Sequence, residues 1–190
     1  MKEIVDFLFE VGMLKKTPRT GYRFLGTGSE SVAEHILRVT YIGYVLSQLE
    51  KDVDEKKVIK LCLLHDLPEA RIGDQNYVYK KYVTVDEEKA VKDLTANLPF
   101  GDDIKELIDE FNKKETKEAM LANDADQLEI ILQVKQEMDL GNKYGKEWLY
   151  YIKKRLITPV AKKMADTIMT RDFSDWWFKD KSDWWVNAQK

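Results

Sequence analysis

The sequence predicts an all-α protein, and three observations carry that prediction. Apolar residues recur every three or four positions along most of the 190-residue chain, which is the spacing of one face of an α-helix. Ser, Asp and Pro residues stand where helices are expected to begin or end. The short apolar run YVYKKYVTV at 77–85 has an extended character, but no segment of similar pattern offers it a partner strand.

The first third of the chain predicts two helices separated by a long loop. Residues 3–14 carry one apolar helical face. Residues 15–30 are rich in Gly, Thr and Ser and predict an extended loop, and long loops in compact domains are often functional. Ser31 and Glu34 then form a capping-box pattern, which opens a helix that runs to about residue 50.

The remaining chain continues this helical pattern. Asp54 is the expected N-cap of a largely apolar helix, and Pro68 ends that helix at about Asp66, because proline disfavours the α conformation in the preceding residue. Further helices are expected over residues 86–97, 103–112, 115–140, 144–155 and 157–171.

Composition predicts a cytoplasmic globular protein. The chain is 44% hydrophobic and 34% charged, has no apolar run long enough to span a membrane, and begins with an acidic amphipathic segment unlike a signal sequence. A net charge of -3 argues against a general nucleic-acid binder. The single cysteine, Cys62, excludes an internal disulfide and a zinc finger, and is expected to be a buried thiol.

The length predicts one domain over residues 1–190. Its core is expected at about 29–140, followed by C-terminal helices and a Trp-rich tail at about 144–190. The tetrapeptide SDWW occurs in this tail at 174–177 and again at 182–185. Aromatic residues dominate core and interface energetics, so the tail is expected to dock onto the domain or onto a second subunit.

The candidate metal ligands are few, because the chain has only two histidines. His35 and His65 each lie on an apolar helix, His65 is followed by Asp66, and a third apolar helix carries Asp124 and Asp126. Imidazole nitrogens and carboxylate oxygens hold divalent metals, and a carboxylate in an apolar helix is unfavourable unless it is paired or metal-bound. A lone His is more often a hydrogen-bonded core residue, so the conjunction on three helices is what predicts a metal site.

Three motifs, taken in order, resemble the H…HD…D signature of the HD-domain phosphohydrolases. They are ESVAEH at 30–35, LLHDLPEARIGD at 63–74 and NDADQLEIILQ at 123–133. The upstream RTGY at 19–22 resembles an Arg-Thr-Gly-Trp segment of the branch that includes the 5′-deoxynucleotidases and the oxetanocin-like proteins. The ordered set spans residue 19 to about residue 135, and it implies a helical bundle with a metal site between its central helices.

Carried over residue by residue, the resemblance makes His35, His65, Asp66 and Asp126 the metal ligands. Asp126 is preferred to Asp124 because the family's Asp precedes a pattern like QLEIILQ, which leaves Asp124 as a neighbour. Two-metal HD enzymes recruit further histidines, and this chain has none to spare. The expected cofactor is therefore one divalent ion, with Mn, Co, Zn, Ni, Fe and Mg all compatible with the ligand set.

The same resemblance assigns four residues to the reaction. Glu69 is expected to transfer a proton, and Asp74 to hold a water or a sugar hydroxyl. Arg19 matches a phosphate-contacting Arg. Tyr22 stands where relatives generally have Trp, so it keeps an aromatic face for a sugar or base but leaves the selectivity for deoxyribose open.

The predicted function is that of a metal-dependent phosphohydrolase, specifically a 5′-nucleotidase that converts (deoxy)ribonucleoside 5′-monophosphates to nucleoside and phosphate. Its expected partners are a small-molecule nucleotide and a second copy of the chain, in a homodimer, with no nucleic acid and no membrane. The alternatives are an HD-type (p)ppGpp or dNTP hydrolase, a non-catalytic metal- or nucleotide-binding helical module, and an interaction protein built around the Trp-rich tail.

Overall fold

Helices make up most of the computed structural model, which describes residues 1–178 and shows no strand within them. The longer helices are α1 (Lys2–Val11), α3 (Val32–Leu49), α4 (Glu55–Leu64), α6 (Glu87–Thr95), α7 (Gly101–Lys113), α8 (Lys117–Asp139), α9 (Gly145–Lys153) and α10 (Pro159–Met169). The short helices are α2 (Tyr22–Leu25), α5 (Glu69–Ile72) and α11 (Asp175–Phe178), and the 3₁₀ turns are η1 (Gly12–Lys15) and η2 (Tyr79–Lys81). The predicted all-α fold is confirmed.

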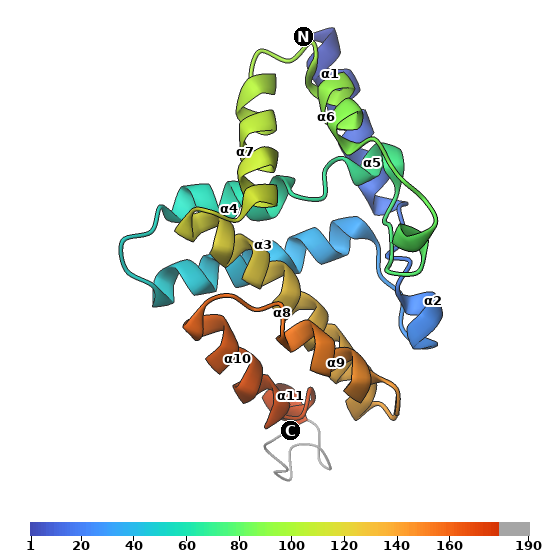
Figure 1. The fold of residues 1–190 in the computed structure, drawn as a ribbon, viewed down its shortest axis with the longest axis vertical. Helices are drawn as coiled ribbons and strands as arrows, with labels where there is room; N and C mark the ends of the chain where they lie inside the picture. The colour runs from blue at the N-terminus through green and yellow to red at the C-terminus, as the bar shows by residue number, and fades with distance from the viewer. Residues whose placement is uncertain (179–190) are drawn as a thin grey trace, which may run out of the picture.

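Three central helices, α3, α4 and α8, pack on one another, and the other helices cover the two ends of this unit (Figure 1). The larger core lies among these three helices and extends to α7, α9 and α10. A smaller core joins η1, the start of α3, α6 and α7. Leu64, the last residue of α4, packs against both cores, so the chain segment that carries His65 and Asp66 leaves α4 where the two cores meet.

The central helices begin where the sequence predicted. The Ser31 hydroxyl accepts the N–H of Glu34, and the Glu34 carboxylate accepts the N–H of Ser31, which completes the capping box of α3. Asp54 caps α4 by accepting the N–H of Lys57. Further along, a Cβ at Gly43 would lie 2.5 Å from Sγ of buried Cys62, so this glycine permits the close approach of α3 and α4.

Three segments differ from the sequence-based expectation. The first helix ends at Val11 and continues as a 3₁₀ turn, which brings Leu14 into the smaller core. The loop predicted over 15–30 is interrupted by α2, which ends at Leu25 and is capped by Gly26, where φ is +85°. The apolar run at 77–85 contains a 3₁₀ turn, because the Asn76 side chain accepts the N–H groups of Val78 and Tyr79.

Only the first of the two SDWW tetrapeptides lies within the described residues. Its last three residues lie in α11, in which the Trp176 side chain is exposed, while the second copy, at 182–185, lies outside the described residues. Among residues 1–178, no helix is both long and apolar enough to cross a membrane.

Candidate metal and active site

The two histidines face each other from neighbouring helices, with ring centroids 5.6 Å apart. Nδ1 of His35, in the first turns of α3, donates to the Glu129 carboxylate at 2.7 Å. Nδ1 of His65, at the end of α4, donates to the carbonyl oxygen of Cys62 at 2.8 Å. These bonds place each ring proton on Nδ1, so the neutral rings carry their lone pairs on Nε2. Both Nε2 atoms are buried without a hydrogen-bond partner.

Two carboxylates face these lone pairs. Oδ1 of Asp126 lies 3.2 Å from Nε2 of His35, and Oδ2 of Asp66 lies 3.5 Å from Nε2 of His35 and 3.3 Å from Nε2 of His65. Ligand atoms of His35, His65 and Asp126 all lie within 4.8 Å of one another. A lone pair and a carboxylate oxygen at such distances repel unless a proton or a metal cation lies between them, and this set of nitrogen and oxygen ligands fits a divalent metal ion.

The electrostatics of the cluster also favour a cation. Burial and the charge of Arg19 act to lower the pKa of His35, but Asp126 and Glu129 outweigh them and raise it to about 10. Burial likewise acts to raise the pKa of Asp66, yet the two histidines and Arg19 hold it well below its usual range. The field of the carboxylates therefore attracts positive charge to the Nε2 atoms.

The turn after α4 explains how adjacent residues reach the same cluster. The α-helix ends at Leu64, two residues before the predicted end, and Leu67 donates its N–H to the carbonyl of Leu64. This tighter turn brings Asp66 next to the His65 ring, as their 3.3 Å separation shows.

Asp124 and Asp126 on α8 have different partners, although they are only two positions apart. Asp126 faces His35, as described above. Asp124 is fully buried and accepts the N–H groups of Ile157 and Thr158, both at 2.7 Å, and the Thr158 hydroxyl at 2.6 Å. Residues two apart on a helix point in nearly opposite directions, so Asp124 holds the start of α10 and is separate from the metal cluster.

Glu69, the first residue of α5, lines a cavity together with Asp66 and Asp126. Its Oε2 atom is buried and has no hydrogen-bond partner. Burial, with the nearby charge of Asp66, raises the pKa of Glu69 to about 9. The carboxyl group can therefore hold a proton at neutral pH, as a general acid must.

Arg19 and Asp74 both line this cavity and are joined to each other at its wall. Nη1 of Arg19 lies 3.1 Å from Oδ2 of Asp66 and 3.2 Å from Oδ1 of Asp74. Asp74 also accepts the N–H of Thr20 at 2.6 Å and the Thr20 hydroxyl at 2.7 Å. Asp74 thus anchors the Arg19 loop, with one carboxylate lone-pair position left beyond these three donors. A guanidinium carries five donors, so Arg19 also retains donors for a phosphate.

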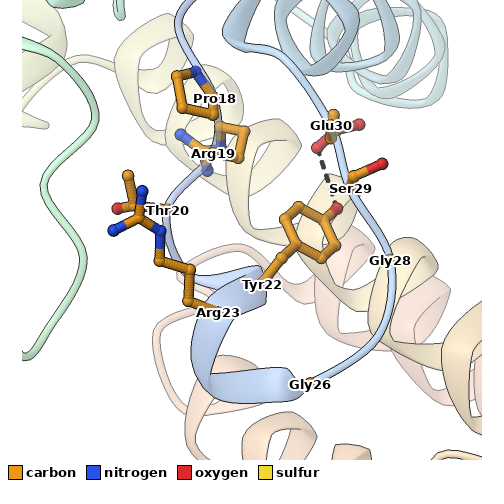
Figure 2. A pocket seen from close by; sticks show the side chains of 9 residues that line it. All are labelled: Pro18, Arg19, Thr20, Tyr22, Arg23, Gly26, Gly28, Ser29 and Glu30. Carbon is orange, nitrogen blue, oxygen red and sulfur yellow. Dashed lines mark hydrogen bonds between the residues drawn. The ribbon is translucent and has the colours of Figure 1, made fainter.

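Tyr22 packs between the Arg19 loop and the segment that precedes α3. Its hydroxyl donates to Oε2 of Glu30 at 3.2 Å, and Figure 2 shows the ring directed toward that carboxylate. A Cβ at Gly28, where φ is +81°, would lie 2.9 Å from ring carbons of Tyr22. Burial raises the pKa of Tyr22 above its ordinary value, so the phenol remains a donor.

One cavity of about 970 Å³ connects these groups. It lies within the range of about 300 to 1,000 Å³ that is common for small-molecule sites. The predicted site residues in its lining are Arg19, Tyr22, Asp66, Glu69, Asp74 and Asp126. The structure therefore brings these predicted residues to one place, with the two histidines buried behind them.

A family model described as "HD domain" matches residues 11–168. This chain belongs to the HD-domain family. The 5′-deoxynucleotidase HDDC2 of Homo sapiens is 32% identical over 158 residues, which cover 79% of this chain and 76% of that protein. The protein of the same name from Mus musculus is 33% identical over 156 residues, or 78% and 76% of the two chains. A solved structure of a conserved hypothetical protein from Pyrococcus furiosus has a TM-score of 0.75 at 30% identity, covering 88% of this chain and 99% of that one.

Glu129 on α8 contacts the cluster, although the sequence did not single it out. Its side chain is 1% exposed, and besides His35 it accepts a 2.9 Å hydrogen bond from Nε of Arg38. Burial acts to raise the pKa of Glu129, but His35 and Arg38 lower it below its usual value. The signal in the sequence was a charged residue three positions after Asp126 in an apolar helix, which places both on one face.

Proposed function

We propose that this HD-domain chain is a metal-dependent 5′-nucleotidase that converts (deoxy)ribonucleoside 5′-monophosphates to nucleoside and phosphate. The observation that carries the proposal is the pair of buried, unpartnered Nε2 atoms of His35 and His65, which face Asp66 and Asp126. The names of the relatives, 5′-deoxynucleotidases at about 30% identity, support the substrate class.

The proposed metal ligands are His35, His65, Asp66 and Asp126, which together hold one divalent ion. When bound, such an ion supplies Lewis acidity, which polarises a phosphate oxygen and lowers the pKa of water. A second group, formed by Glu30, His35 and Glu129, also has ligand atoms within 4.8 Å. Its His35 Nδ1 already donates to Glu129, which supports a single ion in place of two.

The side chains around the cluster have separate roles in binding the substrate and in transferring a proton. Arg19 binds the phosphate through planar N–H donors, and Asp74 and Asp66 hold its guanidinium at the cavity wall. Glu69 donates a proton to the leaving 5′ oxygen, which its raised pKa permits. Asp74 has one remaining acceptor position for a water or a sugar hydroxyl. Tyr22 presents an aromatic face to the sugar or base.

A phosphate-release assay tests the proposal. The substrates are ribo- and deoxyribonucleoside 5′-monophosphates, with Mn²⁺, Co²⁺, Mg²⁺ or Zn²⁺. We expect orthophosphate release, and we expect Glu69→Gln to lower kcat by about 10² to 10⁴, the usual contribution of general acid catalysis, while metal binding is kept. Glu106→Gln, on the exposed face of α7, is the matched control. Full activity of Glu69→Gln would remove the proton-transfer role.

A polyphosphate-nucleotide hydrolase, acting on (p)ppGpp or a dNTP, is the second candidate. The observation in its favour is that Lys80, Lys81 and Lys114 also line the cavity, so positive charge is available for a longer phosphate chain. The product separates the two candidates. Release of pyrophosphate or tripolyphosphate would replace the monophosphate proposal, whereas orthophosphate from monophosphates supports it.

The proposed assembly is a cytoplasmic homodimer of single-domain chains. Apolar side chains exposed on α1, among them Leu8 at 61% and Phe9 at 76%, support an interface between copies. Light scattering should then report twice the 22.3 kDa mass of one chain. A monomeric mass at micromolar concentration would overturn the dimer.

A further inference from the structure

Arg155, in the turn after α9, is a half-buried cation that neither the metal cluster nor the phosphate site uses. It lines the 970 Å³ cavity. Among residues 1–178 it forms no ion pair with a carboxylate, and its contacts are to neutral groups. A partly buried guanidinium is usually paired with an acid, because burying an unpaired charge is unfavourable. On the side that faces the cavity, the Arg155 guanidinium therefore has no acidic partner within residues 1–178. A bound ligand can take that place.

The guanidinium is held in a defined orientation. Its central carbon lies 4.3 Å from the centroid of the Tyr77 ring, and Nη1 donates to Oε1 of Gln127 at 3.4 Å. Both of these partners line the cavity too. Stacking on an aromatic ring fixes the plane of the guanidinium, so its remaining N–H donors have fixed directions.

Gln127 places Arg155 relative to the metal cluster. Its Nε2 donates to Oδ2 of Asp126 at 2.7 Å, while its Oε1 accepts from Arg155. The guanidinium is therefore one glutamine side chain away from a proposed metal ligand. A nucleoside 5′-monophosphate carries its base one sugar away from its phosphate, so a base at Arg155 and a phosphate beside the cluster can belong to one molecule in this cavity.

We propose that Arg155 and Tyr77 bind the nucleobase of the substrate, with the phosphate at Arg19 and the sugar between them. This inference rests on the proposed 5′-nucleotidase function. Every nucleobase carries ring nitrogen or carbonyl acceptors for the donors of Arg155, and a flat face that stacks on an aromatic or guanidinium plane. Trp148 and Tyr151 add aromatic surface to the same cavity.

The test compares substrates with and without a base. The substrates are dAMP, dTMP and 2-deoxyribose 5-phosphate, and the variants are Arg155→Met and Tyr77→Leu of the metal-loaded protein. We expect the KM for both nucleotides to rise about tenfold in Arg155→Met, with kcat within about twofold, as loss of base stacking and hydrogen bonding predicts. The kcat/KM for 2-deoxyribose 5-phosphate should stay within about twofold of wild type. Tyr77→Leu, at an exposed position, should show the same pattern more weakly.

Lys146→Met is the matched control, because Lys146 is an exposed cation in the first turn of α9 and does not line the cavity. A second readout is calorimetric binding of deoxyadenosine, which has a base and no phosphate, and which Arg155→Met should lose. Equal effects on 2-deoxyribose 5-phosphate and the nucleotides, or none on either, would overturn the base site. If wild type hydrolysed no nucleotide, the proposed function would fail, while deoxyadenosine binding would still decide the base site.

Discussion

The candidate site has two walls that are built in different ways. The helix wall consists of His35, His65 and Asp126, which come from α3, from the end of α4 and from α8. The loop wall consists of Arg19 and Tyr22, which lie before α3 and are tied down by side-chain hydrogen bonds. The packed core sets the geometry of the helix wall, whereas polar contacts, together with the packing of Tyr22 against the edge of the larger core, set that of the loop wall.

This difference predicts which substitutions the site tolerates. The helix wall places its ligand atoms through close-packed helices, so a side chain there cannot shift to replace a missing neighbour. The loop wall depends on contacts such as those from Thr20 and Arg19 to Asp74, and each contributes a modest free energy of stabilisation. We therefore expect a substitution in the helix wall to abolish metal binding and activity, and a substitution in the loop wall to lower activity by degrees.

The largest expected effect comes from Asp126→Asn. We expect this variant to lower kcat/KM by at least about a thousandfold and to abolish high-affinity metal binding, because it removes a charged ligand. Asp124→Asn is the matched control, two positions away on the same helix. It should leave metal affinity unchanged but lower the free energy of unfolding by about 1 to 3 kcal/mol, because Asp124 accepts these hydrogen bonds from Ile157 and Thr158, two of which are buried.

Titration calorimetry with Mn²⁺ and urea unfolding, measured on both variants, separate the two roles. The opposite outcome, weak metal binding in Asp124→Asn and normal binding in Asp126→Asn, would exchange the assignments of these residues.

An intermediate effect is expected from Glu129→Gln, which tests whether metal binding by the helix wall depends on the carboxylate that holds the His35 ring. The amide keeps the size of the side chain but loses the charge that holds Nδ1–H of His35. Metal affinity should fall about 10- to 100-fold, as for other groups that orient a ligating histidine. Glu118→Gln, in the first turn of the same helix, serves as the control. Unchanged affinity in Glu129→Gln would show that packing alone orients the ring.

The smallest effect is expected from Gly28→Ala on the loop wall. At φ of +81° an added Cβ is strained, and it would crowd Oε1 of Glu137, the flexible end of a side chain, at 2.7 Å and the Tyr22 ring at 2.9 Å. We expect KM to rise by about three- to tenfold with metal affinity unchanged, because Tyr22 moves and the helix wall does not. Gly26→Ala has a similar φ of +85° but nothing within 4 Å of the added Cβ. Its effect on KM should therefore be smaller at a comparable loss of stability.

Some residues of the site were predictable because their signal is local. His35, His65 and Asp126 stand out as titratable residues on apolar helices, and helix periodicity is a property of neighbouring positions. Glu129, Arg155 and the Tyr77 contact were missed, since nothing in a single sequence says which helix lies opposite a charged residue. The partners of Asp74 were missed for the same reason, because Thr20 lies 54 positions away in the chain.

The sequence by itself determined the helical class, the capped starts of the central helices and the residues available to bind a metal. Those features depend on spacing along the chain and on side-chain chemistry. Only the tertiary structure decided that Asp126 faces His35 while Asp124 holds the start of α10. It also decided that the Nε2 atoms of both histidines lie buried without a hydrogen-bond partner. These outcomes depend on contacts between distant segments, which form only when α3, α4 and α8 pack into one core.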